Sequence, residues 1–429
     1  MVPTAERERA GGEKAVLVGV QLPGTSDEEM AESLEELEAL ARTAGAEPEA
    51  TVTQKLDAYN PATVLGRGKV EDVNRATRAS QADLVIFDNE LTVTQQDRLS
   101  DALDARVVDR TALILDIFAL HAHTGEGKTQ VELAQLSYLL PRIRGRGVEL
   151  SRLGGGIGTR GPGETKLEVD RRRIRRRMHK LEGDLSQMVA VRATQRKRRE
   201  RAGLPGVCLV GYTNSGKSTL LNRLTGAGVV VEDQLFSTLD STSRRLDMAD
   251  GPSIVISDTV GFIRKLPHEL VAAFRSTLEV VMDADLLVHV IDASRRETLQ
   301  DRVRSVEEVL RDLGAEGISR INALNKTDLV ERGELDRLLR VYEGSVTISA
   351  AGGAGIGSLL LAIGESLAAT VLTLRVPAGR GEVLSRLYRD GAVLRTELDG
   401  ETMMVTVRLP GDAKERYREF MGDGAKTTH

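Results

Sequence analysis

The 429-residue chain has little of what several protein classes depend on. Its single cysteine, Cys208, cannot form an internal disulfide, which favours a reducing compartment and a buried, apolar role for that side chain. Its six histidines form no cluster with cysteine, so there is no zinc signature. Apolar runs such as 286–291 fall far short of the roughly 20 residues that span a bilayer, and the N-terminus lacks the apolar core of a signal peptide. We therefore expect a soluble, cytoplasmic protein.

The formal net charge of −5 hides a basic segment. Between Arg142 and Arg201 there are 19 Lys and Arg against 7 Asp and Glu, a local excess of 12 positive charges. Such polarity predicts contact with a polyanion through one part of the chain. Aromatic side chains are sparse in this segment, so base stacking should not dominate, and shape and backbone charge favour structured, double-stranded RNA.

One stretch, 211–218, fits the Gly-x-x-x-x-Gly-Lys-Ser pattern of a phosphate-binding loop. It lies between an apolar run, 206–210, and the start of an amphipathic helix, 218–224, as such a loop requires. Backbone N–H groups would hold the β-phosphate, Lys217 would bridge the β- and γ-phosphates, and the Ser218 hydroxyl would ligate Mg²⁺. The nucleotide-binding residues predicted here are Gly211, Tyr212, Thr213, Asn214, Ser215, Gly216, Lys217, Ser218 and Thr219. Alone, the loop would also fit an ATPase or a structural glycine turn.

A second motif, Asp-Thr-Val-Gly at 258–261, narrows the choice. Asp258 follows the apolar run 254–256, so its carboxylate should lie at a strand tip and hold a water on Mg²⁺. The N–H of Gly261 would then sense the γ-phosphate.

A third motif, Asn-Lys-Thr-Asp at 325–328, identifies the base. Asp328 can accept hydrogen bonds from guanine N1–H and N2–H₂, a pair of donors that adenine lacks. We expect Asn325 to hydrogen-bond with O6 and N7 of guanine, and Lys326 to lie along the base and ribose. The backbone N–H of Ala350, which follows Ser349, is expected to contact O6. The three motifs together predict a domain that binds GTP and GDP with Mg²⁺.

Between the first two motifs, 236–242 is the only hydroxyl-rich segment. We expect Thr238 to be a second hydroxyl ligand of Mg²⁺ that closes only when the γ-phosphate is bound. Ser237 and Thr242 are the alternatives, as is a plain polar loop.

Phe262 occupies the position at which Ras-like GTPases orient the attacking water with glutamine. Its side chain can neither donate nor accept a hydrogen bond, so no catalytic side chain is assigned with certainty and unaided hydrolysis should be slow. A partner that orders the nucleotide-sensing segments could position the attacking water instead. Alternatively, Phe262 could serve only in packing.

The chain predicts four domains of mixed α/β class. Strands alternating with helices indicate an N-terminal α/β domain, 1–110, with a parallel sheet. A basic helical hairpin arm with a glycine-rich loop, 111–203, precedes the P-loop domain, 204–369. A small C-terminal α+β domain, 370–429, reads as strand, helix, strand, turn, strand and a short helix over 413–420.

The arm should be an antiparallel helix pair. Apolar residues from Leu167 to Met188 recur at heptad spacing, and their natural partner is a helix over 128–140. The glycine-rich stretch 152–163 between them disfavours helix and strand, and predicts a flexible, basic loop that contacts RNA. The alternative is that this stretch is only a linker between the two helices. The predicted RNA contacts are Arg152, Arg160, Arg171, Arg172, Arg173, Arg175, Arg176 and Arg177.

With these motifs in hand, the chain resembles the HflX family of translational GTPases over nearly its whole length. The most specific matches outside the nucleotide motifs lie at 110–118, 126–136 and 154–165, with switch regions at 236–240 and 258–268. The resemblance implies a factor that binds the large ribosomal subunit, points its glycine-rich loop toward the peptidyl transferase centre, and splits or rescues stalled ribosomes under stress. It also implies a hydrophobic residue at the Phe262 position and hydrolysis stimulated by the ribosome. Lys166 stands where the family pattern leads us to expect glutamine.

Three functions fit these residues to different degrees. The first is the ribosome-activated GTPase, which we expect to be a monomer when free. The second is a ribosome-assembly GTPase that acts on immature particles. The third is a regulatory switch with a protein partner, in which the arginines form a docking face.

Overall fold

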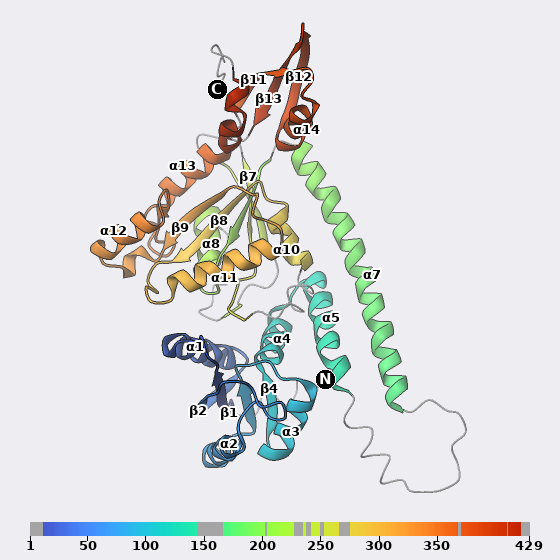
Figure 1. Cartoon of the computed structure of the whole chain (residues 1–429), viewed down its shortest axis with the longest axis vertical. Coiled ribbons are helices and arrows are strands. Elements are labelled where there is room, and N and C mark those ends of the chain that lie inside the picture. The colour runs from blue at the N-terminus through green and yellow to red at the C-terminus, as the bar shows by residue number, and fades with distance from the viewer. Residues whose placement is uncertain are drawn as a thin grey trace. The chain divides into compact units, whose positions relative to one another are not determined.

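The computed structural model describes residues 12–143, 166–201, 204–226, 235–236, 242–248, 253–265, 275–367, 370–409 and 411–421. Strands and helices alternate through two largely parallel sheets before an antiparallel C-terminal sheet (Figure 1), which confirms the predicted fold class. The chain divides into two compact units. One comprises 1–194 with 232–240 and 260–277, and the other comprises 195–231, 241–259 and 278–429. Both predicted switch segments therefore fall largely in the unit that contains the N-terminal sheet.

The N-terminal sheet domain extends from β1 through α4. Its strands are β1 (Glu13–Gln21), β2 (Ala46–Lys55), β3 (Leu84–Phe87) and β4 (Arg106–Asp109), paired in the order β2-β1-β3-β4 and all parallel. Its helices are α1 (Asp27–Thr43), α2 (Arg67–Ser80), α3 (Val93–Leu103) and α4 (Arg110–His121). The chain leaves β1 to one side for β2 and then crosses to the other side for β3, so the sheet is wound in both directions.

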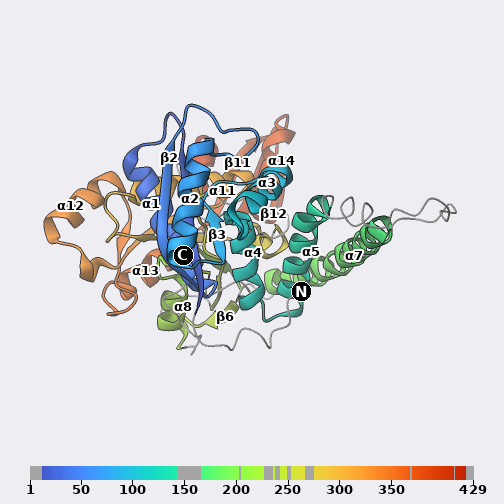
Figure 2. The same ribbon diagram turned by 90° about the horizontal axis from the view of Figure 1, so that it is seen from below.

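Strand alternation assigns the two faces of this sheet. Val16, Val18 and Val20 of β1 share a core with apolar residues of α2 and α3. On the opposite face, α1 lies so close that a Cβ on Gly19 would come within 2.0 Å of the Met30 methyl carbon. Figure 2 looks onto this domain, with its helices around the strands.

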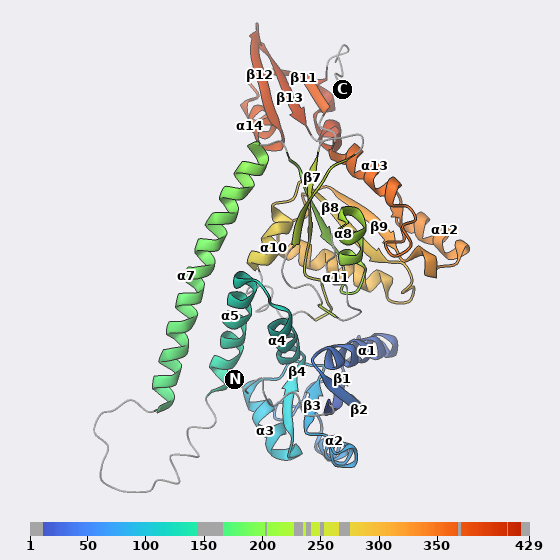
Figure 3. The same ribbon diagram turned by 180° about the vertical axis from the view of Figure 1, so that it is seen from behind.

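Two helices run side by side, α5 (Gly125–Arg142) and α7 (Lys166–Arg201), as Figures 1 and 3 both show, and α7 belongs to the same unit as α5 up to Thr194. Glu132 pairs with Arg177 at 2.6 Å, and Glu126 pairs with Arg192 at 2.6 Å. Residue numbers rise along one helix as they fall along the other, so the helices are antiparallel. Leu181 is the buried centre of the α7 seam at 2% exposure.

The six-stranded sheet belongs to the second unit. It contains β5 (Gly206–Val210), β6 (Thr242–Leu246), β7 (Ile254–Asp258), β8 (Leu286–Asp292), β9 (Arg320–Asn325) and β10 (Val346–Thr347), in the order β10-β9-β8-β5-β7-β6. Only β6 pairs antiparallel within this sheet. α8 (Lys217–Thr225) and α13 (Ile356–Leu367) share one core with the sheet, whereas α11 (Leu299–Asp312) and α12 (Arg332–Val341) share another. α10 (Arg275–Met282) precedes β8, and η2 (Thr327–Leu329) follows β9.

The C-terminal sheet has the order β11-β13-β12 and is antiparallel. Its elements are β11 (Thr370–Pro377), α14 (Gly381–Asp390), β12 (Ala392–Asp399), β13 (Thr402–Leu409) and η3 (Gly411–Phe420). The short helix expected over 413–420 lies within η3. This element is a 3₁₀ helix with non-helical dihedrals at Tyr417, whose buried side chain donates a 2.7 Å hydrogen bond to Asp390.

None of the helices in the described ranges combines the length and the hydropathy that a bilayer crossing needs.

Candidate nucleotide site and basic arm

The phosphate-loop motif lies between β5 and α8, as the sequence predicted. Two of its glycines are required by close approach. A Cβ on Gly211 would lie 2.3 Å from the carbonyl oxygen of Val290, and one on Gly216 would lie 2.3 Å from Nδ2 of Asn325. Gly216 also has φ of 95°, a conformation that favours glycine. Since α8 begins at Lys217, the loop leads directly into the N–H groups of a helix N-terminus, which is a ready-made phosphate site.

Lys217 is buried in this loop and bends back over it. Its Nζ donates to the carbonyl oxygens of Gly211 at 3.1 Å and Tyr212 at 2.9 Å. Burial lowers the pKa of Lys217 to about 8, although the nearby Asp258 carboxylate opposes the shift. A phosphate would supply a stronger anionic partner for this ammonium group than two carbonyl dipoles do.

A hydroxyl and a carboxylate meet where the sequence places the metal. Ser218 Oγ donates to Asp258 Oδ2 at 2.6 Å. The other carboxylate oxygen, Oδ1, is buried and has no hydrogen-bond partner in the described part of the chain. Burial raises the pKa of Asp258, opposed by the Lys217 charge and the Ser218 hydrogen bond. Mg²⁺ takes oxygen ligands of this kind, so the residues present fit the ion.

Two more hydroxyls of the loop fit a bound ligand. Thr213 Oγ1 and Ser215 Oγ are buried, and neither has a hydrogen-bond partner among the described residues. Buried polar atoms normally have hydrogen-bond partners, so these hydroxyls and Asp258 Oδ1 are available to a polar ligand of the phosphate loop.

Asn325 has a role that the sequence did not predict. Its Nδ2 donates to the carbonyl oxygen of Ser215 at 2.8 Å, and its Oδ1 accepts the N–H of Ala350 at 2.9 Å. The amide thus joins the phosphate loop to the loop after β10. Two of the groups that we expected to contact guanine, the Asn325 amide and the Ala350 N–H, are hydrogen-bonded to each other here.

The other base-reading residues stand apart from this bridge. Lys326 adopts φ of 62° and pairs with Asp292 at 2.8 Å. Asp328 is exposed, so its carboxylate is open to a ligand. Ser349 is buried and caps its own turn, with its Oγ accepting the N–H of Gly352 at 2.9 Å.

The switch segments are described only in part. Thr238 and Ser237 lie outside the described residues, whereas Thr242 begins β6 and is paired in register with Asp258. Phe236 is buried at 3% exposure and meets Phe118 of α4 edge to face, with ring centroids 4.7 Å apart. Phe262 belongs to the same unit and is buried at 1% exposure, so this side chain is a packing residue in the described conformation.

The arginine run of the arm lies on α7. Arg172, Arg173, Arg175, Arg176 and Arg177 are exposed, and Arg171 is half-buried. Arg177 is held by Glu132 of α5, which raises its pKa further. Arg152 and Arg160 lie outside the described residues.

Sequence reasoning missed a buried ionic cluster in the N-terminal unit. It centres on Arg110, whose side chain is 2% exposed and pairs with Glu36 and Asp88. The only available signal was the strand-end position of Asp88 and Arg110, which follow β3 and β4 directly. The remaining members of the cluster are far apart in sequence.

Family models cover most of the chain in consecutive segments. Residues 31–119 match the GTP-binding GTPase N-terminal model, and 121–199 match the GTP-binding GTPase middle region. Residues 206–326 match a model described as 50S ribosome-binding GTPase.

Curated relatives match over nearly the full length. GTPase HflX of Caldanaerobacter subterraneus subsp. tengcongensis is 48% identical over 411 residues, covering 95% of this chain and 94% of the relative. GTPase HflX of Escherichia coli is 44% identical over 405 residues, covering 93% and 94%. A GTP-binding protein from Sulfolobus solfataricus in complex with GDP is similar at 25% identity and a TM-score of 0.43, covering 82% of this chain and 97% of that one. The resemblance noted in the sequence is thereby confirmed, and the chain belongs to the HflX family of GTPases.

Proposed function

We propose that this GTPase binds the large ribosomal subunit and splits or rescues stalled ribosomes in the cytoplasm, with hydrolysis stimulated by the ribosome. The observation that carries the proposal is the row of exposed arginines on α7 between Arg172 and Arg177, on a helix that ion pairs join to α5. Four or more neighbouring guanidinium groups repel one another in water and are favoured next to a polyanion.

The nucleotide site is proposed from the geometry of the phosphate loop. Lys217 and the N-terminus of α8 would hold the phosphates, and Asp328 would read guanine. Ser218 would ligate Mg²⁺ directly, Asp258 would act on it through water, and Thr238 would join when the γ-phosphate is present. Bound there, Mg²⁺ would neutralise charge on the β- and γ-phosphates.

Phe262 gives the reason for a dependence on the ribosome. Its side chain is buried and cannot orient water, so the chain itself offers no group for that step at this position. A ribosomal surface that orders the switch segments would position the attacking water instead.

The test is GTP turnover with and without purified large subunits, with small subunits as the control. Stimulation of about tenfold or more, equivalent to about 1.4 kcal/mol of barrier, is expected only with large subunits. No stimulation by any particle, with GTP still bound, would contradict the proposal and favour a protein partner. Stimulation by precursor particles but not by mature subunits would favour ribosome assembly.

A further inference from the structure

The N-terminal sheet is an open α/β sheet, a type of sheet that commonly holds ligands in a crevice. In such sheets the crevice lies beyond the carboxyl ends of the strands, where the winding reverses direction. Here that point is between β1 and β3. Asp88 follows β3 directly, its N–H donates to the carbonyl oxygen of Val18 at 2.8 Å, and its side chain is fully buried.

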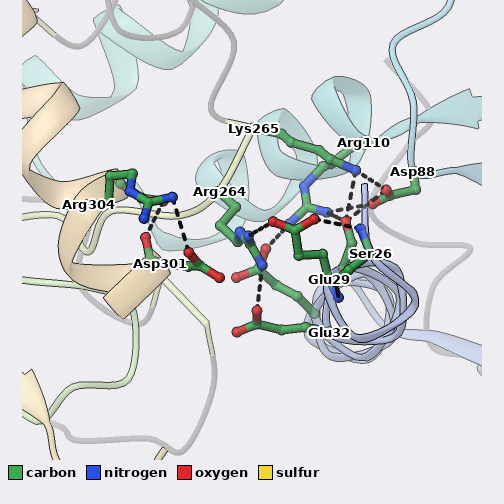
Figure 4. Close-up of polar contacts among 12 residues, drawn as sticks. Ser26, Glu29, Glu32, Asp88, Arg110, Arg264, Lys265, Asp301 and Arg304 are labelled. Carbon is green, nitrogen blue, oxygen red and sulfur yellow. Dashed lines mark hydrogen bonds and ion pairs between the residues drawn. The ribbon is translucent and has the colours of Figure 1, made fainter. Parts of the chain in front are cut away.

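The group that lies at this point is a lysine from the second switch segment. Lys265 Nζ forms an ion pair with Asp88 Oδ2 and donates to Ser33 Oγ at 2.9 Å. Ser33, on α1, also donates to Asp88 Oδ2 at 2.8 Å. Figure 4 shows Lys265 reaching Asp88 beside Arg110.

Charge balance explains why a cation is held there. Arg110 donates to Asp88 Oδ1 at 2.6 Å and pairs with Glu36, so two buried carboxylates surround one buried guanidinium. Lys265, whose side chain is 47% exposed, adds a second positive charge beside these two carboxylates. Burial alone would raise the pKa of Asp88, but Arg110 and Lys265 together hold it below its ordinary value.

A second contact fixes the neighbouring residue. Arg264 is paired with Glu32 of α1 and lies 3.8 Å from Glu29 one turn earlier. Consecutive basic side chains of one segment are therefore bound to separate acidic positions on the N-terminal sheet domain (Figure 4). Phe262 and Ile263, just before them, are buried at 1% and 2% exposure.

We propose that Lys265 is a positioning residue for GTP hydrolysis, which anchors the second switch segment to Asp88 and Ser33 of the N-terminal sheet domain. The inference rests on the proposed roles of Asp258 and Gly261, which lie seven and four residues before Lys265. A segment pinned at this end loses less conformational freedom when GTP orders it, so Gly261 is presented to the γ-phosphate at a lower entropic cost. GDP has no γ-phosphate, so the contact of Lys265 with Asp88 should not strengthen GDP binding.

The test is Lys265→Met in the full-length chain, compared with Lys265→Arg and with Lys69→Met, which replaces an α2 lysine that pairs with Asp72. We expect Lys265→Met to lower kcat for GTP and the affinity for a non-hydrolysable GTP analogue by about fivefold or more, because a charged hydrogen bond is lost. Affinity for GDP should stay within about twofold. Lys265→Arg should keep most of the activity, and Lys69→Met should match the wild type.

A double-mutant cycle identifies the partner. If Lys265 acts through Asp88, adding Lys265→Met to Asp88→Asn should cause little further loss. Because Arg110 also depends on Asp88, thermal melting is measured alongside, and Ser33→Ala replaces Asp88→Asn if that variant fails to fold.

Three results would overturn the anchor: unchanged or faster hydrolysis in Lys265→Met, an equal loss of GDP affinity, or additive effects in the cycle. The proposed nucleotide site fails separately, through unchanged base preference in Asp328→Asn, which does not involve Lys265.

Discussion

At the scale of single residues, Asp328 is the clearest test of base recognition. Its carboxylate is exposed and is expected to accept two hydrogen bonds from guanine. Asp328→Asn should weaken GDP binding by about tenfold or more and shift preference toward xanthine nucleotides, since the amide NH₂ can donate to the second carbonyl of xanthine. Competition binding of GDP against xanthosine diphosphate measures this. Asp312→Asn, an exposed α11 variant, is the matched control.

His289 predicts a pH dependence of stability. It is buried in β8 with Nδ1 lacking a hydrogen-bond partner among the described residues, and burial, with Arg320 and Lys217 nearby, lowers its pKa to about 3. In the unfolded chain the pKa is about 6.5, so below that pH only the unfolded state takes up the proton. Neutral His289 therefore contributes fully to the free energy of unfolding above about pH 6.5, and this contribution is lost as pH falls toward 3. Between pH 7 and pH 5 the expected loss of stability is about 2 kcal/mol.

Urea unfolding at pH 7, 6 and 5 measures this loss. His289→Asn should flatten the profile over that window, whereas His179→Asn, which replaces a histidine 92% exposed on α7, should leave it unchanged. A wild-type profile that is already flat would contradict the role of His289.

At the scale of elements, the exposed face of α7 should bind without stabilising the fold. Replacing Arg172, Arg173, Arg175 and Arg176 with Gln should leave the melting temperature nearly unchanged, since exposed ion pairs contribute only about 0–1 kcal/mol. Affinity for large subunits should fall, and the slope of its logarithm against the logarithm of salt concentration should become shallower by up to about 3. Filter binding at several salt concentrations checks this, with Arg332, Arg337 and Arg340 of α12 replaced as the control. An unchanged salt slope would refute the role of α7.

Elements with strong local signals were predictable from the sequence. The start of α1 is one such signal, because Ser26 and Glu29 form a capping box there, a pattern that the sequence itself displays. The phosphate loop was equally clear, since its glycines mark close approaches. What the sequence could not supply were contacts without local periodicity. Asn325 joins Ser215 across 110 positions and Lys265 joins Asp88 across 177, and no pattern along the chain links such pairs.

At the scale of the whole molecule, the contact between Lys265 and Asp88 predicts that the bound nucleotide changes the dynamics of the N-terminal sheet domain. Binding of a GTP analogue, compared with GDP, should slow amide hydrogen exchange in α1 and at the carboxyl end of β3, because the segment held there becomes ordered. Exchange measured by mass spectrometry checks this, with the C-terminal sheet as the internal control. Equal exchange in the two nucleotide states would contradict the coupling.

The division of the chain into interleaved units has a practical consequence for dissecting the protein. The segments 232–240 and 260–277 belong by sequence to the P-loop region and by contacts to the N-terminal unit. A fragment that begins near 204 would therefore expose Phe236, now 3% exposed, and leave Lys265 without its carboxylate. A fragment intended for measuring GTP hydrolysis must therefore begin before β1, even though a fragment that begins near 204 contains all the nucleotide motifs.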